Sequence, residues 1–159
     1  MSGATSTRAD RELRAQTVVA APPEAVWSDL SDLRRLPARS PELVRMFPLL
    51  PGGLRVGQQY LGINRRKLVV WPSRNVIAVL DPGRELAWDT RTSGARWIFE
   101  LSAQDAGTLV VQRRSVPRRL TLVGRLFGRF FLGGGEGHAD ELEAGMVATL
   151  ERLKAAVEG

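Results

Sequence analysis

The chain has 159 residues, of which 43% are hydrophobic and 25% charged, and this fits one folded domain. It has no cysteine, which excludes disulfide bonds and thiolate chemistry. The residues before Leu13 are polar and lack the apolar core of a signal peptide, and no segment reaches the roughly 20 apolar residues that span a bilayer. We therefore expect a flexible tail over 1–12, a single domain over 13–159 and a cytoplasmic location.

The formal net charge is +6, from 23 basic and 17 acidic residues, and the excess is local. No aspartate or glutamate occurs between Ala106 and Gly135, whereas six arginines do. The rest of the chain is balanced, so the sequence does not predict a generally basic surface.

The first predicted elements are one strand and two short helices. Gln16–Ala21 is a short apolar strand, ended by two prolines. Glu24–Leu30 follows as a helix, because a proline and an acidic residue suit a helix N-terminus. A second short helix is expected at Leu33–Leu36 or just beyond it, before Ser40-Pro41 breaks the helical pattern.

The middle of the chain predicts strands joined by short turns. Alternating apolar and polar residues cover 56–61, 67–80, 85–92, 95–102 and 108–116. We expect a kink at Trp71-Pro72, because proline lacks the donor that a central strand needs. Short turns favour antiparallel pairing, since parallel strands need long crossovers.

The last element is a long helix over 136–157. Its apolar residues recur at three- and four-residue steps, at Leu142, Met146, Leu150, Leu153 and Val157. It is the only predicted element long enough to cover the apolar face of the sheet. The sequence therefore predicts an α+β fold.

Several segments occur in an order and spacing that are typical of one family. They are the run APPEAVWSDLSDL, the pattern Gly57–Asn64 with Trp71, and the segments Pro82–Trp88, Trp97–Thr108 and Gly145–Lys154. Together they resemble the SRPBCC superfamily (START-like, helix-grip), in its polyketide cyclase/dehydrase-like branch. The resemblance implies a curved antiparallel sheet of six or seven strands around the C-terminal helix, with an apolar cavity between them. Members use this cavity to bind lipids, hormones or polyketides, or to catalyse cyclisation and dehydration.

The candidate cavity residues are mainly aromatic. We expect Tyr60, Trp71, Trp88, Trp97 and Phe99 on the concave face, where they line a ligand pocket or simply pack the core. Met146 and Leu150 of the last helix would face them.

The strand over 108–116 has two alternative registers. In one, Leu109, Val111, Arg113 and Ser115 share the inner face. A buried Arg113 needs a partner, and would anchor a carboxylate or enolate or pair with Glu100 or Asp89. The other register places Gln112 and Arg114 inside instead.

Other sites are weakly indicated, and we expect no metal or cofactor. His138 is the single histidine and cannot build a zinc site alone, although it could act as a base. Gly133–Gly137 lacks the lysine and hydroxyl residue of a phosphate loop, so a flexible hinge is the simpler interpretation. Tyr60, Asp89, Glu100 and Arg113 are the available acid or base candidates.

The segment Arg118–Leu132 is unusually basic and aromatic. Its apolar stripe includes Leu126, Phe127, Phe130 and Phe131. This pattern predicts a helix over the cavity mouth, or a basic amphipathic helix that contacts anionic membranes. Nucleic-acid binding is the weaker interpretation, because the phenylalanines lie on the apolar side and no nucleic-acid motif is present.

The sequence supports two hypotheses for function. The first is binding, or transfer, of a small hydrophobic ligand such as a lipid or polyketide in the cavity. The alternative is a cyclase or dehydratase that uses the same cavity, for which a buried acid or base on the inner face would be required.

Overall fold

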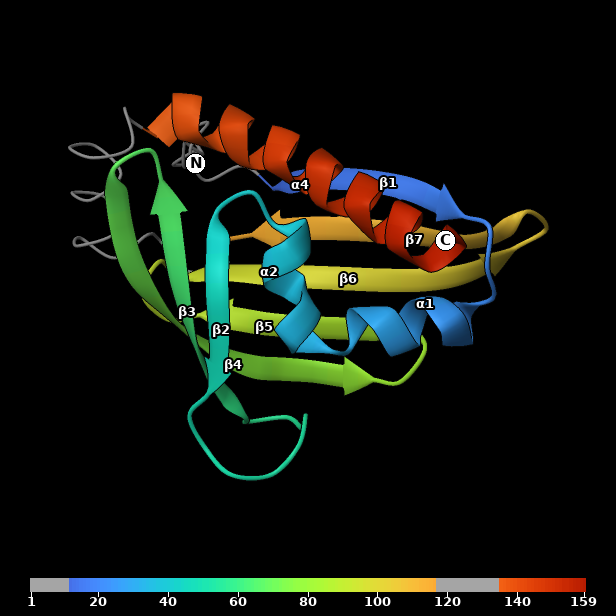
Figure 1. Ribbon diagram of the computed structural model, residues 1–159, viewed down its shortest axis with the longest axis horizontal. Coiled ribbons are helices and arrows are strands. Elements are labelled where there is room, and N and C mark those ends of the chain that lie inside the picture. Colours follow the sequence, from blue (N-terminus) through green and yellow to red (C-terminus); the bar gives the residue numbers. More distant parts are fainter. Residues whose placement is uncertain (1–11, 117–134) are drawn as a thin grey trace, which may run out of the picture.

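A seven-stranded antiparallel sheet forms the body of the protein, with helices on one of its faces (Figure 1). The computed structural model describes residues 12–116 and 135–159, with side chains only from residue 140 onward in the second range. The strand order is β1-β7-β6-β5-β4-β3-β2. The sheet curves around the C-terminal helix, which confirms the predicted α+β helix-grip fold.

The elements follow the predicted order. The strands are β1 (Leu13–Val19), β2 (Leu43–Pro48), β3 (Gln59–Arg66), β4 (Val69–Asp81), β5 (Glu85–Thr90), β6 (Ala95–Gln104) and β7 (Gly107–Ser115). The helices are α1 (Pro23–Leu30), the 3-10 helix η2 (Leu33–Arg35), α2 (Leu36–Arg39) and α4 (Gly135–Glu158).

The predicted strands differ from the structure in three places, the first of which is the strand expected over 56–61, which forms as β3 over Gln59–Arg66. Edge strand β2 was not predicted, because a bulge between Leu43 and Arg45 breaks the alternation that identifies a strand. The extended stretch predicted over 67–80 is instead a turn at Lys67 and Leu68 followed by β4. Pro72 is tolerated within β4 because the β5 register begins only at Asn75, so its missing N–H leaves no hydrogen bond to β5 unmade.

Helix α4 packs along β1 and β7 through the predicted apolar stripe. Met146, Leu150 and Leu153 are each only 1% exposed and belong to the main core, together with Phe99 of β6. The C-terminal end of α4 is tied to the end of β1, because Lys154 Nζ donates to Val18 O at 2.7 Å. Apolar burial and this hydrogen bond together determine which part of the sheet lies under α4.

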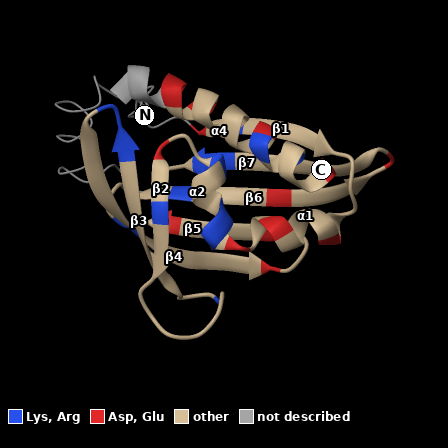
Figure 2. Ribbon diagram, viewed as in Figure 1, with Lys and Arg blue, Asp and Glu red and all other residues tan. Residues whose placement is uncertain are grey.

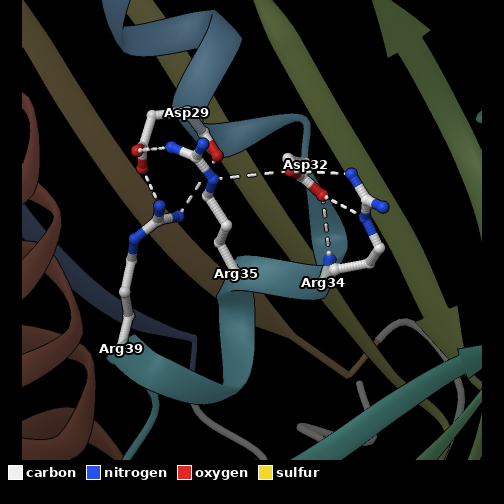
Figure 3. Close-up of polar contacts among 5 residues, drawn as sticks. All are labelled: Asp29, Asp32, Arg34, Arg35 and Arg39. Atoms are coloured by element: carbon white, nitrogen blue, oxygen red, sulfur yellow. Dashed lines mark hydrogen bonds and ion pairs between the residues drawn. The ribbon is translucent and has the colours of Figure 1, made fainter.

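Helices α1 and α2 lie beside α4 on the same face of the sheet and are held by a buried ion pair (Figures 1 and 3). Asp29 of α1 pairs with Arg39 of α2, and both side chains are almost fully buried. Arg39 Nη1 also donates to Asp29 O at 3.3 Å, and Arg35 Nη1 donates to Asp29 Oδ2 at 2.9 Å. Arg152 of α4 donates to Arg39 O at 3.1 Å, so contacts at Arg39 connect α1, α2 and α4.

Removing the carboxylate of this buried pair should destabilise the fold. Asp29→Asn leaves the Arg39 guanidinium buried without its counter-charge, and we expect a loss of about 3–5 kcal/mol in the free energy of unfolding. Urea denaturation followed by circular dichroism measures this loss.

The neighbouring Asp32 provides the matched control. Its partner Arg34 has a side chain that is 85% exposed, so Asp32→Asn should cost less than about 1 kcal/mol. Equal losses in the two variants would contradict the role assigned to Asp29.

Candidate ligand-binding face of the sheet

The side of the sheet that faces α4 is defined by the register of β7. Leu13 of β1, Val110 of β7 and Phe99 of β6 are core residues. Leu13 lies opposite Arg114, and Phe99 lies opposite Gln112. Alternation along the strand therefore turns Val110, Gln112 and Arg114 toward α4.

Three predicted cavity residues of β7 lie on the other face of the sheet. Leu109, Val111 and Arg113 point away from α4, so the second of the two registers is the one that forms. Arg113 pairs there with Glu100 and Glu12. The other predicted acid, Asp89, also lies on this outer face, where Arg96 Nε donates to its Oδ1 at 2.7 Å.

The predicted aromatic residues lie together on the inner face. Trp88 and Trp97 are opposite each other on β5 and β6, and the Trp88 and Phe99 ring centroids are 5.8 Å apart. Tyr60 is buried in the same core, to which Met146 and Leu150 of α4 also belong. Trp71 is half-buried on the inward side of β4. These residues supply a broad apolar surface.

A strip of polar side chains crosses this apolar surface on β3, β4 and β5. The polar strip consists of Asn64, Ser73, Asn75 and Thr90. Thr90 Oγ1 donates to Asn75 Oδ1 at 2.8 Å, and Asn64 Nδ2 donates to Ser73 Oγ at 3.0 Å. No sequence motif marks this strip, although alternation from Trp71 places Ser73 and Asn75 on the same face.

Gly62 allows the polar strip to pack closely. It lies on β3 opposite Ser73, and a Cβ at this position would lie 2.6 Å from Ser73 Oγ and 3.2 Å from Asn75 Nδ2. Any larger residue would push these side chains away.

Two further polar side chains of the inner face come from β7. Gln112 is 5% exposed and Arg114 is 6% exposed. Within the described part of the chain, no group donates a hydrogen bond to Gln112 Oε1. Buried polar atoms are nearly always hydrogen-bonded, so this amide oxygen is an available acceptor on the face that α4 covers.

Glu42, just before β2, is a partly buried acid that no sequence pattern identified. Burial raises the pKa of its carboxyl group, and the nearby Arg66 and Arg114 oppose this effect without cancelling it. Arg66 itself forms an ion pair with Glu141 of α4. No local pattern marked Glu42, because its neighbours Arg66 and Arg114 come from distant strands. Burial also raises the pKa of Tyr60, the one predicted acid or base candidate on the inner face.

Several predicted residues lie outside the described residues. They are Leu126, Phe127, Phe130 and Phe131, together with the side chain of His138. Within 12–116 and 135–159, no group of three or more histidine, cysteine, aspartate or glutamate side chains could hold a metal ion. No helix in the same ranges has the length and apolar character needed to cross a membrane.

The raised pKa of Glu42 predicts how stability depends on pH. The folded state holds the Glu42 proton more tightly than the unfolded state, so stability should fall as pH rises from the ordinary value of 4.5 through the folded pKa. Glu42→Gln removes the buried charge and should raise the melting temperature at about pH 8 while changing it little at about pH 4.

The exposed Glu151 of α4 provides the control for this comparison. Its carboxylate lies in water, so Glu151→Gln should change the melting temperature little at either pH. A lower melting temperature for Glu42→Gln at about pH 8 would instead show that Arg66 and Arg114 hold Glu42 as a stabilising anion.

Solved structures with the same fold cover almost the whole chain. The KanY protein is 19% identical, with a TM-score of 0.68 over 94% of this chain and 99% of its own. A Thermus thermophilus protein is 18% identical, with a TM-score of 0.67 over 92% and 97%. The di-domain ARO/CYC StfQ from the steffimycin biosynthetic pathway is 15% identical, with a TM-score of 0.69 over 92% of this chain and 50% of its own. Among curated proteins, none matches the sequence.

The family assignment rests on the sequence itself. The family described as polyketide cyclase / dehydrase and lipid transport matches residues 10–158, almost the full length. The resemblance to the polyketide cyclase/dehydrase-like branch of the SRPBCC superfamily is thereby confirmed. With this match and the helix-grip fold, the chain belongs to the polyketide cyclase / dehydrase and lipid transport family.

Proposed function

We propose that the protein binds a small, largely apolar molecule, with hydrogen-bonding groups of its own, against the inner face of the sheet. The observation that carries this proposal is Gln112, whose buried amide oxygen lacks a donor among the described residues. An unpaired buried acceptor is unfavourable in an ordinary core, whereas a hydroxyl group of a bound ligand would satisfy it.

The surroundings of Gln112 favour an aromatic or polyketide-like ligand. Trp88, Trp97 and Phe99 offer flat apolar surfaces, and Phe99 lies directly opposite Gln112. The polar strip lies on β3, β4 and β5, away from β1 and β7, where α4 packs. A ligand between the strip and α4 would meet apolar groups over most of its area and polar groups at a few points, as is typical of small-molecule sites.

Binding can be tested with two probes that differ by one hydroxyl group. Equilibrium dialysis should give a tighter dissociation constant for 2-naphthol than for naphthalene. Gln112→Leu should weaken 2-naphthol binding about 5-fold and leave naphthalene binding nearly unchanged, because only the hydroxyl group donates to the amide. Quenching of tryptophan fluorescence gives an independent readout, since three of the four tryptophans lie on the inner face.

Gln16→Leu is the matched control for Gln112→Leu. Gln16 is an exposed glutamine opposite Val111 on the outer face, so its replacement should leave both dissociation constants unchanged. If neither probe binds saturably, or if the two variants affect binding equally, the proposed site is wrong.

A second candidate function is cyclisation or dehydration of a polyketide-like substrate, and Glu42 favours it. A carboxyl group whose pKa is raised by burial keeps its proton to a higher pH than an ordinary glutamate, so it is better suited to act as a general acid. Arg114, on the inner face, acts electrostatically on this carboxyl group. StfQ, which shares the fold, carries the ARO/CYC designation in its own name.

The enzymatic candidate can be tested with 3-hydroxy-1-tetralone. This β-hydroxyketone loses one water to become 1-naphthol, a reaction that needs a base at the carbon and an acid at the hydroxyl group. The reaction is followed by the fluorescence of 1-naphthol. Acceleration by the protein that Glu42→Gln reduces at least about 100-fold would support it, and no acceleration over buffer would exclude this dehydration.

A further inference from the structure

We propose that the tip of the β3–β4 hairpin docks on the surface of an anionic phospholipid membrane. The hairpin tip is defined here as Arg65, Lys67, Leu68 and Val70. None of these residues belongs to the inner face described above, so the proposal does not rest on the proposed ligand.

The hairpin tip exposes large apolar side chains. Leu68 is 93% exposed, more than any other large hydrophobic residue in the described part of the chain, and Val70 is 59% exposed. Leu68 lies in the turn, and Val70 is the second residue of β4. Apolar side chains at the end of a hairpin can enter the interface of a bilayer without rearrangement of the sheet.

The positive charge around these apolar side chains favours an anionic partner. Between Gln59 and Leu80 the chain has four basic residues and no acidic one. Arg65, Arg66 and Lys67 lie at the turn, and Figure 2 shows basic residues at this end of the hairpin, whereas Arg74 lies further along β4 opposite Leu61. Arg66 is paired with Glu141, but Arg65 and Lys67 are exposed. Exposed cations beside exposed apolar groups match the surface of a bilayer that contains anionic lipids.

The hairpin geometry places Arg65 and Val70 on the same side of the sheet. Arg65 lies directly opposite Val70 in the β3–β4 register, so the two side chains are neighbours on the face turned away from α4. Arg65 Nε donates to Lys67 O at 3.0 Å across the turn, where Lys67 has a φ of 55°. The tip is therefore already ordered, and docking would cost little conformational entropy.

A membrane fits this surface better than a second copy of the chain. A symmetric contact would bring Arg65 and Lys67 of both copies together, and like charges would repel. Strand addition at the free edge of β4 is hindered by Pro72, which has no N–H to donate.

Vesicle flotation with the full chain tests the proposal. The protein should bind phosphatidylcholine vesicles that contain about one third phosphatidylserine, and bind pure phosphatidylcholine vesicles at least about 5-fold more weakly. Leu68→Ser should weaken binding to anionic vesicles about 10-fold. Lys67→Asn should weaken it about 5-fold, since asparagine tolerates the left-handed backbone and carries no charge.

Two exposed positions outside the tip serve as controls. Val56, in the loop between β2 and β3, is 60% exposed, so Val56→Thr is matched to Val70→Thr. Arg84, in the turn after β4, has a side chain that is 79% exposed, so Arg84→Gln is matched to Arg65→Gln. Only the tip variants should weaken binding, while circular dichroism and melting temperature stay unchanged in all four variants.

Three results would overturn the proposal. The first is an absence of binding to anionic vesicles, and the second is an equal loss of binding in tip and control variants. The third is binding that Arg125→Gln and Arg129→Gln abolish while the tip variants leave it intact. Sedimentation velocity tests the alternative that the tip binds a second copy of the chain. If the tip variants alter self-association and leave vesicle binding unchanged, a second copy is the partner and the membrane proposal is wrong.

Discussion

The register of β7 between β1 and β6 fixes which side chains lie beneath α4. Strand side chains alternate, so a shift by one residue would exchange the two faces completely. The register that forms pairs Gln112 with Phe99 and turns Arg113 outward. The inner face, and with it the candidate ligand site, depends on this pairing. Val110 is part of the core in this register, whereas the alternative would turn Leu109, Val111 and Arg113 toward α4.

The buried polar groups described here are of two kinds, those with partners in the fold and those that burial leaves in an unfavourable state. The Asp29–Arg39 pair and the polar strip have partners within the fold, so they add specific geometry with little uncompensated desolvation. The Gln112 amide oxygen lacks such a donor among the described residues, and burial disfavours the charged form of Glu42. The proposed ligand binding rests on the first of these residues, and the proposed dehydration rests on the second.

The β3–β4 hairpin connects the two proposed surfaces. Asn64 points inward to the polar strip, whereas its neighbour Arg65 points outward beside Val70. Two residues in sequence thus serve opposite sides of the sheet, as strand periodicity requires. Arg66 points inward again and joins the hairpin to α4 through Glu141. A hydrophobic ligand and a membrane surface would accordingly meet different faces of one rigid element.

The sequence by itself determined the order of elements, the fold class and the apolar stripe of α4, since helical and strand periods are local properties. The same alternation placed Trp88 and Trp97 correctly on one face. It could not choose between Arg113 and Gln112, because both faces of β7 carry apolar residues. It also missed β2, where a bulge breaks the period, and the surroundings of Glu42. Only the tertiary structure decided the inner face of β7, the pairing of β2 and the environment of Glu42, because strand register and buried electrostatics depend on residues far apart in the chain.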